Sequence, residues 1–209
     1  MKKIVAIKSC HRDCGNGFNQ VVRDTWLRAA PVDYKFFVGT GNSILKPDEE
    51  PLNVGDAYMD LPNKTRAIFR WVLDHAYDHA FLCDTDTYVV GRKLAAYDPS
   101  GYDLIGYFNG PIGVPRAVEG KYAWVSGGAG YWVSRRAMEM IVSKVPTSWA
   151  EDLWVGQVVG EAVQRGWLKA LNDPKYGDNN EITSHFCSTG MKRTFDIQWM
   201  HQKHREKEQ

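Results

Sequence analysis

The segment that most constrains the fold is a continuous apolar run, Ala80–Cys83, which ends directly at Asp84. A strand with apolar side chains on both faces has to be covered on both faces, which is typical of a central strand in a parallel sheet. In open sheets of this kind, ligands bind beyond the carboxyl ends of the strands. The run therefore predicts an α/β sheet whose binding site includes the polar residues after Cys83.

Helical and extended patterns alternate on both sides of this run. Apolar residues spaced three and four apart predict an amphipathic helix over Thr65–His79, and a short apolar strand, Ile4–Lys8, precedes a polar loop at Ser9–Asn19. The other expected elements are a helix carrying Val21, Val22, Thr25 and Trp26, strands at Tyr34–Val38, Asp103–Tyr107 and Tyr131–Val133, helices at Arg135–Val145 and Asp152–Arg165, and a polar loop at Ile44–Asn53. This alternation predicts a three-layer α/β/α sandwich with a mostly parallel central sheet.

Length and charge limit the organisation of the chain. Its 209 residues suit one domain, because a chain of this size buries roughly 70% of its unfolded surface around a single core. We assign residues 1–198 to that domain and residues 199–209 to a charged, solvated tail. Lys and Arg number 26 against 25 Asp and Glu, so no overall field attracts nucleic acid or an anionic membrane.

No part of the sequence predicts a membrane span or an export signal. The apolar stretch Ile4–Ile7 is much shorter than the ~18 residues that a span requires. The spacing of Cys10 and Cys14 fits no usual zinc pattern, and a chain without an export signal normally keeps its thiols reduced. We therefore expect a cytoplasmic protein with four free thiols, at Cys10, Cys14, Cys83 and Cys187.

Two carboxylates, Asp84 and Asp86, follow the apolar run two residues apart. Carboxylates in this position can converge on one hard cation, and Mg²⁺ or Mn²⁺ prefers oxygen ligands that it shares with a diphosphate. Such a cation neutralises charge on a departing nucleoside diphosphate. His185 offers a nitrogen that could complete the site. The alternatives are a polar turn for the acids and a surface or core position for His185.

A glycine-rich segment, Tyr122–Ser134, lies between aromatic residues. Its glycines allow the backbone to approach a ligand closely or to adopt a positive φ. The residues singled out here are Gly127, Gly128 and Gly130, with Trp124, Tyr131 and Trp132 as flat faces suited to a sugar ring. The alternative is a tight turn with aromatic residues in the core.

An acidic pair, Glu151 and Asp152, lies at the expected start of a helix. Ser148 and Glu151 have the spacing of a capping box, and the helix dipole alone favours acids in a first turn. In the functional alternative, Asp152 is a general base that deprotonates an acceptor hydroxyl.

The order of these segments resembles family 31 of the glycosyltransferases, the β1,3-galactosyltransferase, fringe and core 1 synthase group. The resemblance covers most of the chain. Its motifs are Arg23–Trp26, Phe36–Gly39, Asp60–Thr65 with Trp71, Asp84–Asp86, Ser126–Tyr131 with Ser134, and Glu151–Asp152 with Gly156. Several motifs in one order are far more specific than any one of them.

The resemblance implies a GT-A fold and an inverting glycosyltransferase that uses a UDP-sugar and Mn²⁺, or Mg²⁺, to make a β-linked product. It implies metal ligands at Asp84, Asp86 and His185. It implies a nucleotide and sugar pocket formed by Arg23, Lys64, Asp84, Asp86, Gly127 and Gly128. It also implies a catalytic base within the pair Glu151 and Asp152, with Asp152 in that role.

The chain departs from the family at Thr85, which replaces a middle acid, and the family's membrane anchor, stem and disulfide pattern do not occur in this sequence. We expect an unanchored relative to be bacterial or viral. Its hydroxyl-bearing acceptor would be a glycan precursor or a hydroxymethylated base of phage DNA. Phosphate contacts for DNA could come from Lys192, Arg193, Lys203, His204 and Arg205, although a solvated tail is the simpler interpretation of these charges.

Two other functions share parts of this pattern. A haloacid-dehalogenase-like phosphatase also has an Asp-x-Asp motif after a strand, in which the first acid is a nucleophile, but that motif normally follows the first strand. A binding module for nucleotide sugars or glycans would keep the cleft without turnover. The intact Asp152 favours an enzyme over such a module.

Overall fold

The computed structural model of the chain describes residues 1–114, 122–177, 179–185 and 197–208. The strands of its central sheet are β1 (Lys3–Lys8), β2 (Asp33–Val38), β3 (Glu49–Pro51), β4 (His79–Asp84), β6 (Leu104–Gly106), β7 (Tyr131–Ser134) and β8 (Ala170–Asn172). They lie in the order β3-β2-β1-β4-β7-β6-β8. Neighbouring strands are parallel except that β7 is antiparallel to both β4 and β6. The prediction of a mostly parallel sheet is confirmed.

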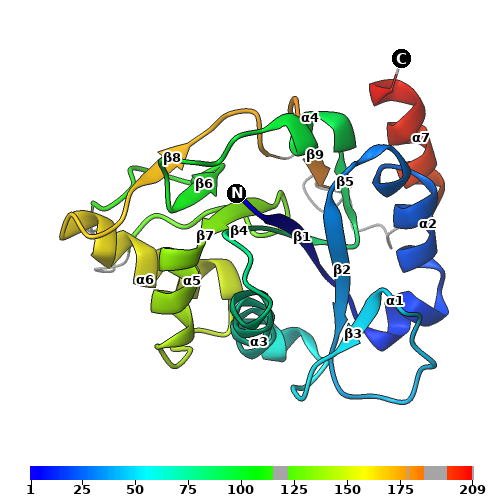
Figure 1. Cartoon of the computed structure of the whole chain (residues 1–209), viewed down its shortest axis with the longest axis horizontal. Coiled ribbons are helices and arrows are strands. Elements are labelled where there is room, and N and C mark those ends of the chain that lie inside the picture. Colours follow the sequence, from blue (N-terminus) through cyan, green and yellow to red (C-terminus); the bar gives the residue numbers. More distant parts are fainter. Residues whose placement is uncertain (115–121, 178, 186–196, 209) are drawn as a thin grey trace.

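Helices cover both faces of this sheet (Figure 1). They are α1 (His11–Gly15), α2 (Phe18–Asp24), α3 (Leu61–Asp74), α4 (Gly91–Ala96), α5 (Arg135–Val142), α6 (Glu151–Gln164) and α7 (Ile197–Lys207), with short 3₁₀ helices η1 (Leu27–Ala29) and η2 (Tyr58–Asp60). One buried cluster joins α3, α5 and α6 to the sheet, and a second joins α2, α4 and α7 to the other face. These two cores establish the predicted three layers.

The central strand β4 is covered as its sequence predicts. All four residues of Ala80–Cys83 are fully buried. The parallel register between β1 and β4 pairs Lys8 with Asp84, the last residue of each strand. A lysine and an aspartate therefore lie side by side at the carboxyl edge of the sheet.

A second, two-stranded sheet joins residues that are far apart in the chain. It consists of β5 (Thr87–Val89) and β9 (Thr183–His185), which pair in antiparallel fashion with Thr87 opposite His185. Since β5 begins directly after Asp86, this pairing brings His185 to the end of β4.

The expected polar loops contain regular structure. Ser9–Asn19 includes α1 and the start of α2, and Ile44–Asn53 includes β3. Both loop predictions were wrong because buried polar side chains have partners that the sequence does not reveal. Asp13 in α1 is 6% exposed and accepts a hydrogen bond from Thr85, and Glu49 in β3 is also 6% exposed and pairs with Arg23.

Two helix boundaries differ from the prediction. The helix expected at Thr65–His79 begins four residues earlier, with Pro62 in its first turn, where a missing N–H costs nothing. It ends at Asp74, and the chain then turns at Ala76, whose φ is 57°. The α2 helix ends at Asp24, before the Thr25 that we expected within it.

The carboxyl-terminal residues form a packed helix. The prediction of a solvated tail at 199–209 was wrong where the structure describes these residues, because α7 continues to Lys207 and buries Met200 completely. The Tyr88 hydroxyl on β5 and Nδ1 of His204 form a hydrogen bond of 3.1 Å. The helix α7 therefore supports the two-stranded sheet.

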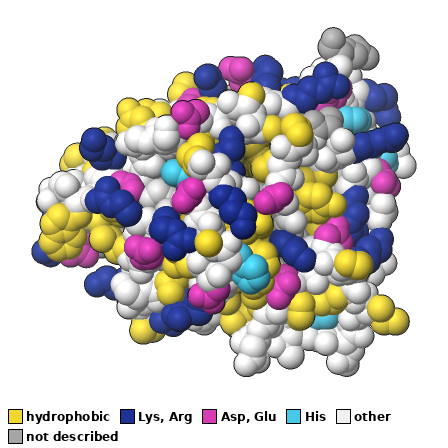
Figure 2. Space-filling model, in the orientation of Figure 1, with side chains coloured by type: hydrophobic (Ala, Val, Ile, Leu, Met, Phe, Trp, Pro, Cys, Tyr) yellow, Lys and Arg dark blue, Asp and Glu magenta, His cyan; other side chains and the backbone are white. Residues whose placement is uncertain are grey.

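Charged side chains of both signs are interspersed over the face shown in Figure 2. None of the helices among the described residues is long and apolar enough to cross a bilayer. Cys10, Cys14 and Cys83 are free thiols, as expected, and Cys187 lies outside the described residues.

Candidate functional site

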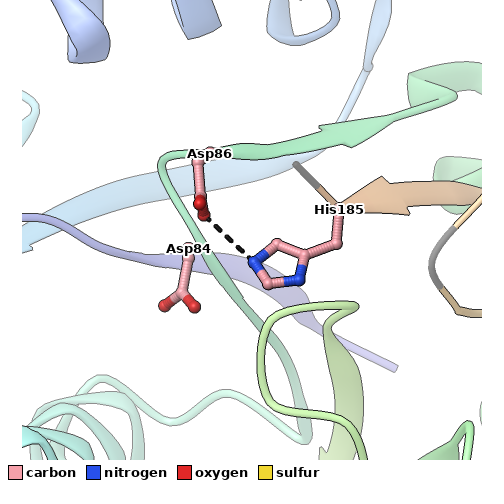
Figure 3. Close-up of side chains that lie close together, drawn as sticks. All are labelled: Asp84, Asp86 and His185. Atoms are coloured by element: carbon pink, nitrogen blue, oxygen red, sulfur yellow. Dashed lines mark ion pairs between the residues drawn. The ribbon is translucent and has the colours of Figure 1, made fainter. Parts of the chain in front are cut away.

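Three predicted metal ligands converge at the end of β4. Asp84 is the last residue of β4, Asp86 lies in the turn before β5, and His185 ends β9. One ligand atom from each lies within 4.8 Å of the other two. In Figure 3 the Asp86 carboxylate and the His185 ring face one another, and they are 3.4 Å apart. We call these residues the Asp-Asp-His cluster; it combines two carboxylates and an imidazole at one point.

A buried lysine lies beside this cluster. Nζ of Lys8 is 3.1 Å from Oδ1 of Asp84 and 2.8 Å from Oε2 of Glu151, and its side chain is 3% exposed. Burial alone lowers the pKa of Lys8, but the charges of Asp84 and Glu151 outweigh it and raise that pKa above its usual value. Lys8 is therefore a permanent positive charge between the two acids.

Glu151 has both carboxylate oxygens engaged. Oε2 pairs with Lys8, and Oε1 accepts a hydrogen bond from the hydroxyl of Tyr131. The predicted capping box is wrong, because α6 has Ala150 at its N-cap and the Ser148 hydroxyl accepts only from the N–H of Ala150. Glu151 points instead into the core beneath the site. Both oxygens of this buried carboxylate therefore have partners, and a catalytic role for Glu151 stays a prediction.

Asp152, the next residue of α6, lies in a different environment. It is half-buried, and its Oδ1 accepts a hydrogen bond from the N–H of Leu153. Burial raises the pKa of Asp152 above its usual value, and the charge of Glu151 raises it further. A carboxylate that is partly exposed and more basic than usual is suited to accept a proton.

The glycine-rich loop lies between the acidic pair and the Asp-Asp-His cluster. A Cβ on Gly127 would lie 3.0 Å from Oε2 of Glu151 and 3.2 Å from Cβ of Asp152. A Cβ on Gly128 would lie 2.0 Å from the ring of His185. Glycine is therefore required at Gly128, where a larger residue would displace a proposed ligand. Among the three glycines of the loop, only Gly130 has a positive φ, of 79°.

The middle residue of the Asp-x-Asp motif points away from the cluster. The hydroxyl of Thr85 donates a 2.7 Å hydrogen bond to Oδ2 of Asp13, and Thr85 is 5% exposed. A carboxylate at this position would lie beside the buried carboxylate of Asp13. This contact gives a structural reason for Thr85 in place of an acid.

The two predicted nucleotide contacts lie in different surroundings. Lys64 is buried, and its amine donates to the carbonyl of Ser9, directly after β1, and to the Asp56 carboxylate. Arg23 forms hydrogen bonds with Asp48 and Glu49 beside β3, three strand spacings or about 14 Å from β4. Lys64 therefore lies at the same sheet edge as the cluster, whereas Arg23 lies toward the edge strand. Their roles at a nucleotide stay predictions.

The aromatic residues proposed for a sugar ring mostly belong to the core. Tyr131 is fully buried and Trp132 is 1% exposed, and Nε1 of Trp132 donates to the hydroxyl of Tyr176. Only Trp124 is partly accessible. The interpretation of Tyr131 and Trp132 as sugar-binding faces was wrong, because β7 is a central strand with both faces covered.

Of the basic residues considered for DNA, Arg205 is exposed, whereas Lys203 and His204 have partners within the described part of the chain. Lys203 pairs with Glu206 at 2.8 Å, and His204 is bonded to Tyr88. Lys192 and Arg193 lie outside the described residues.

Several residues around the site carry no signal in the sequence. Lys8 could have been found only from the strand register, which places it beside Asp84. Tyr58 and Trp149 also lie near the acidic pair; their rings are 6.0 Å apart, and the phenol of Tyr58 is within electrostatic reach of Asp152. Tyr58 belongs to η2 and Trp149 to the segment before α6, and neither residue is part of a recognisable motif.

The chain was compared with known proteins. No protein-family model and no curated protein matches it. Its structure is similar to that of a glycosyltransferase involved in the glycosylation of the major capsid of PBCV-1, with a TM-score of 0.57 and 13% identity over 95% of this chain and 99% of that chain. It is also similar to A197 from STIV, with a TM-score of 0.49 and 12% identity over 89% and 86% of the two chains. The likeness to the PBCV-1 structure spans nearly all of both chains, so the present chain shares the fold of that protein.

Proposed function

We propose that this chain is an inverting, metal-dependent glycosyltransferase that moves a sugar from a UDP-sugar to an acceptor hydroxyl. The observation that carries the proposal is the Asp-Asp-His cluster at the carboxyl end of β4, joined to Asp152 through the loop at Gly127 and Gly128. The fold shared with the PBCV-1 glycosyltransferase supports it. The narrower assignment to family 31 rests on the motifs alone.

The donor set fits Mn²⁺. Carboxylate oxygens suit Mg²⁺ and Mn²⁺, whereas an imidazole nitrogen favours a transition metal, so two carboxylates with one imidazole favour Mn²⁺ over Mg²⁺. Asp84, Asp86 and His185 would hold the ion. When bound there, it would neutralise the charge that develops on the leaving diphosphate. Lys8 holds the Asp84 carboxylate in place at 3.1 Å.

Asp152 is the proposed general base. It takes the proton of the acceptor hydroxyl while the acceptor oxygen forms a bond to the anomeric carbon. The bond between that carbon and UDP breaks, and UDP leaves with the electron pair. Attack opposite the leaving group inverts the anomeric centre. Glu151, held by Lys8 and Tyr131, fixes the start of α6 and so the position of Asp152.

Two substitutions separate the metal role from the base role. Asp86→Ala should abolish metal-dependent binding of a UDP-sugar, because it removes a central ligand. Asp152→Asn should leave that binding nearly intact and lower turnover by about 100-fold or more. Mn²⁺ binding followed by electron paramagnetic resonance and UDP binding followed by calorimetry provide readouts other than activity. Equal loss of binding in both variants would contradict the two roles.

The reaction class is tested by what the chain releases. Slow release of UDP from a UDP-sugar with Mn²⁺ supports the transferase. Release of inorganic phosphate from simple esters would support a phosphatase instead, and binding without turnover would support a binding module. A screen of UDP-sugars by thermal shift with Mn²⁺ would identify the donor, because a ligand that binds only the native state raises the melting temperature.

A further inference from the structure

Two exposed aromatic side chains form a pair at the edge of the site. Tyr58 comes from η2, and Trp149 precedes α6. Their ring centroids are 6.0 Å apart, with planes inclined by 44°. Tyr58 is 67% exposed and Trp149 is 56% exposed. Core packing does not account for two large rings that meet across the fold and stay largely in solvent, and exposed apolar groups of this kind are typical of binding sites.

The pair lies beside the proposed base. Trp149 is three residues before Asp152, in the segment that leads into α6. Partial loss of hydration raises the pKa of the Tyr58 phenol, and the charges of Asp152 and then Asp84 raise it further. Such coupling requires the phenol to be near both carboxylates. An acceptor sugar whose hydroxyl is held at Asp152 is therefore within reach of this aromatic pair.

The chemistry of the pair suits a sugar. A pyranose ring has apolar C–H faces and a rim of hydroxyls, whereas tyrosine and tryptophan combine a flat apolar face with a polar O–H or N–H. They also provide rigid contact area at low cost in conformational entropy. An exposed aromatic pair beside a base thus matches a sugar ring that presents one hydroxyl for reaction.

The local charge disfavours a polyanion. The charged groups that act most strongly on the Tyr58 phenol are three carboxylates, on Asp152, Asp84 and Glu151, and one ammonium, on Lys8. A DNA strand would bring phosphates toward this negative surplus and be repelled, whereas an uncharged sugar would not. The carboxylates of Glu151 and Asp152, which lie outside the Asp-Asp-His cluster, therefore favour a neutral glycan over DNA as the acceptor.

We infer that Tyr58 and Trp149 form the acceptor subsite, and that they stack against a terminal, uncharged sugar of the acceptor glycan. The inference rests on the proposed function and narrows its acceptor from any hydroxyl compound to a neutral glycan.

A titration followed by NMR tests the subsite without turnover. The ¹⁵N-labelled chain, with Mg²⁺ and UDP present to avoid paramagnetic broadening, is titrated with methyl β-galactoside, methyl β-glucoside and methyl α-mannoside. The chain has eight tryptophans, and the Trp149 indole signal is identified by its loss in Trp149→Phe. At least one glycoside should shift this signal in a saturable way. Tyr58→Ala should weaken binding of that glycoside about tenfold.

Two further variants control for a general effect of the substitutions on folding. Trp167 is 54% exposed and lies after α6, so Trp167→Ala is a matched control and should change glycoside affinity less than about twofold. Tyr58→Phe keeps the ring and should retain most of the affinity. If Tyr58→Ala does not fold, Tyr58→Phe and the Trp149 signal still test the proposal.

The outcomes separate this inference from the proposed function. It is overturned if no glycoside shifts the Trp149 signal, if Trp167→Ala weakens binding as much as Tyr58→Ala, or if a short duplex containing hydroxymethylcytosine binds in the same Tyr58-dependent way. If the chain releases UDP but gives one of these results, the acceptor subsite is refuted and the proposed function is not. If a glycoside shifts the Trp149 signal and no UDP-sugar is ever turned over, the subsite stands and the transferase does not.

Discussion

Lys8→Met tests whether the buried charges beneath the site stabilise the fold as a unit. Lys8 is 3% exposed at its side chain, and Glu151 is 4% exposed, with 2.8 Å between Nζ and Oε2. Methionine is similar in length and keeps the packing but removes the ammonium group. Glu151 would then remain as a buried carboxylate with only the Tyr131 hydroxyl as a partner. Asp84, whose side chain is 30% exposed, can regain water.

The expected loss follows from the uncompensated charge on Glu151. Breaking a buried ion pair on one side typically costs about 3–5 kcal/mol, because the remaining charge has lost its partner without regaining water. For a chain of this size, 1 kcal/mol corresponds to about 2–4 °C in melting temperature, so Lys8→Met should melt roughly 6–20 °C below the wild type. Urea unfolding followed by circular dichroism would give the free energy directly.

A double substitution provides the control. In Lys8→Met with Glu151→Gln both charges are absent, and the glutamine can still accept the Tyr131 hydrogen bond. The double variant should therefore be more stable than Lys8→Met alone, since removal of both members of a buried pair costs far less than removal of one. A loss below about 1 kcal/mol in the single variant, or simple additivity in the double variant, would refute the argument.

Three other predictions concern single residues. Asp152→Asn should raise the free energy of unfolding at pH 7, because burial disfavours the charged carboxylate of Asp152 in the folded chain and so raises its pKa. This gain in stability should vanish below about pH 3.9, where the carboxyl group is protonated in both the folded and the unfolded state. Gly128→Ala should weaken Mn²⁺ binding about 10–100-fold by displacing His185, and unchanged affinity in a paramagnetic titration would exclude His185 as a ligand. Thr85→Val should lower stability by about 1–3 kcal/mol in urea unfolding, because it removes the donor to buried Asp13, yet leave Mn²⁺ affinity within about twofold.

The layers of the fold could be predicted because they depend on patterns within short segments. The apolar run Ala80–Cys83 can be buried on both faces only in a central strand, and this one segment indicated both the sheet and the edge that carries the site. Predictions failed where polar side chains are buried with distant partners. Asp13 and Glu49 look like loop residues in the sequence, but they pair with Thr85 and Arg23.

The candidate site could be predicted only in part, for the same reason. The Asp-x-Asp spacing follows directly from the chain, and it indicated carboxylates that the structure brings close to His185. The role of an aromatic residue depends instead on which strand carries it. Tyr131 is in the centre of the sheet and is buried, whereas Trp149 is in a loop and is exposed. The residue type alone does not distinguish a buried aromatic side chain from an exposed one.

The acidic pair at the start of α6 shows how one helix gives two neighbouring carboxylates different chemistry. Successive residues of a helix point about 100° apart, so Glu151 turns into the core while Asp152 stays at the surface of the site. Lys8 and Tyr131 hold Glu151, and the retained charge of Glu151 in turn raises the pKa of Asp152. The buried acid is therefore more than a structural anchor, because its charge makes its neighbour a stronger base. Glutamine at Glu151 would still accept the hydrogen bond from Tyr131, yet it would weaken the proposed base.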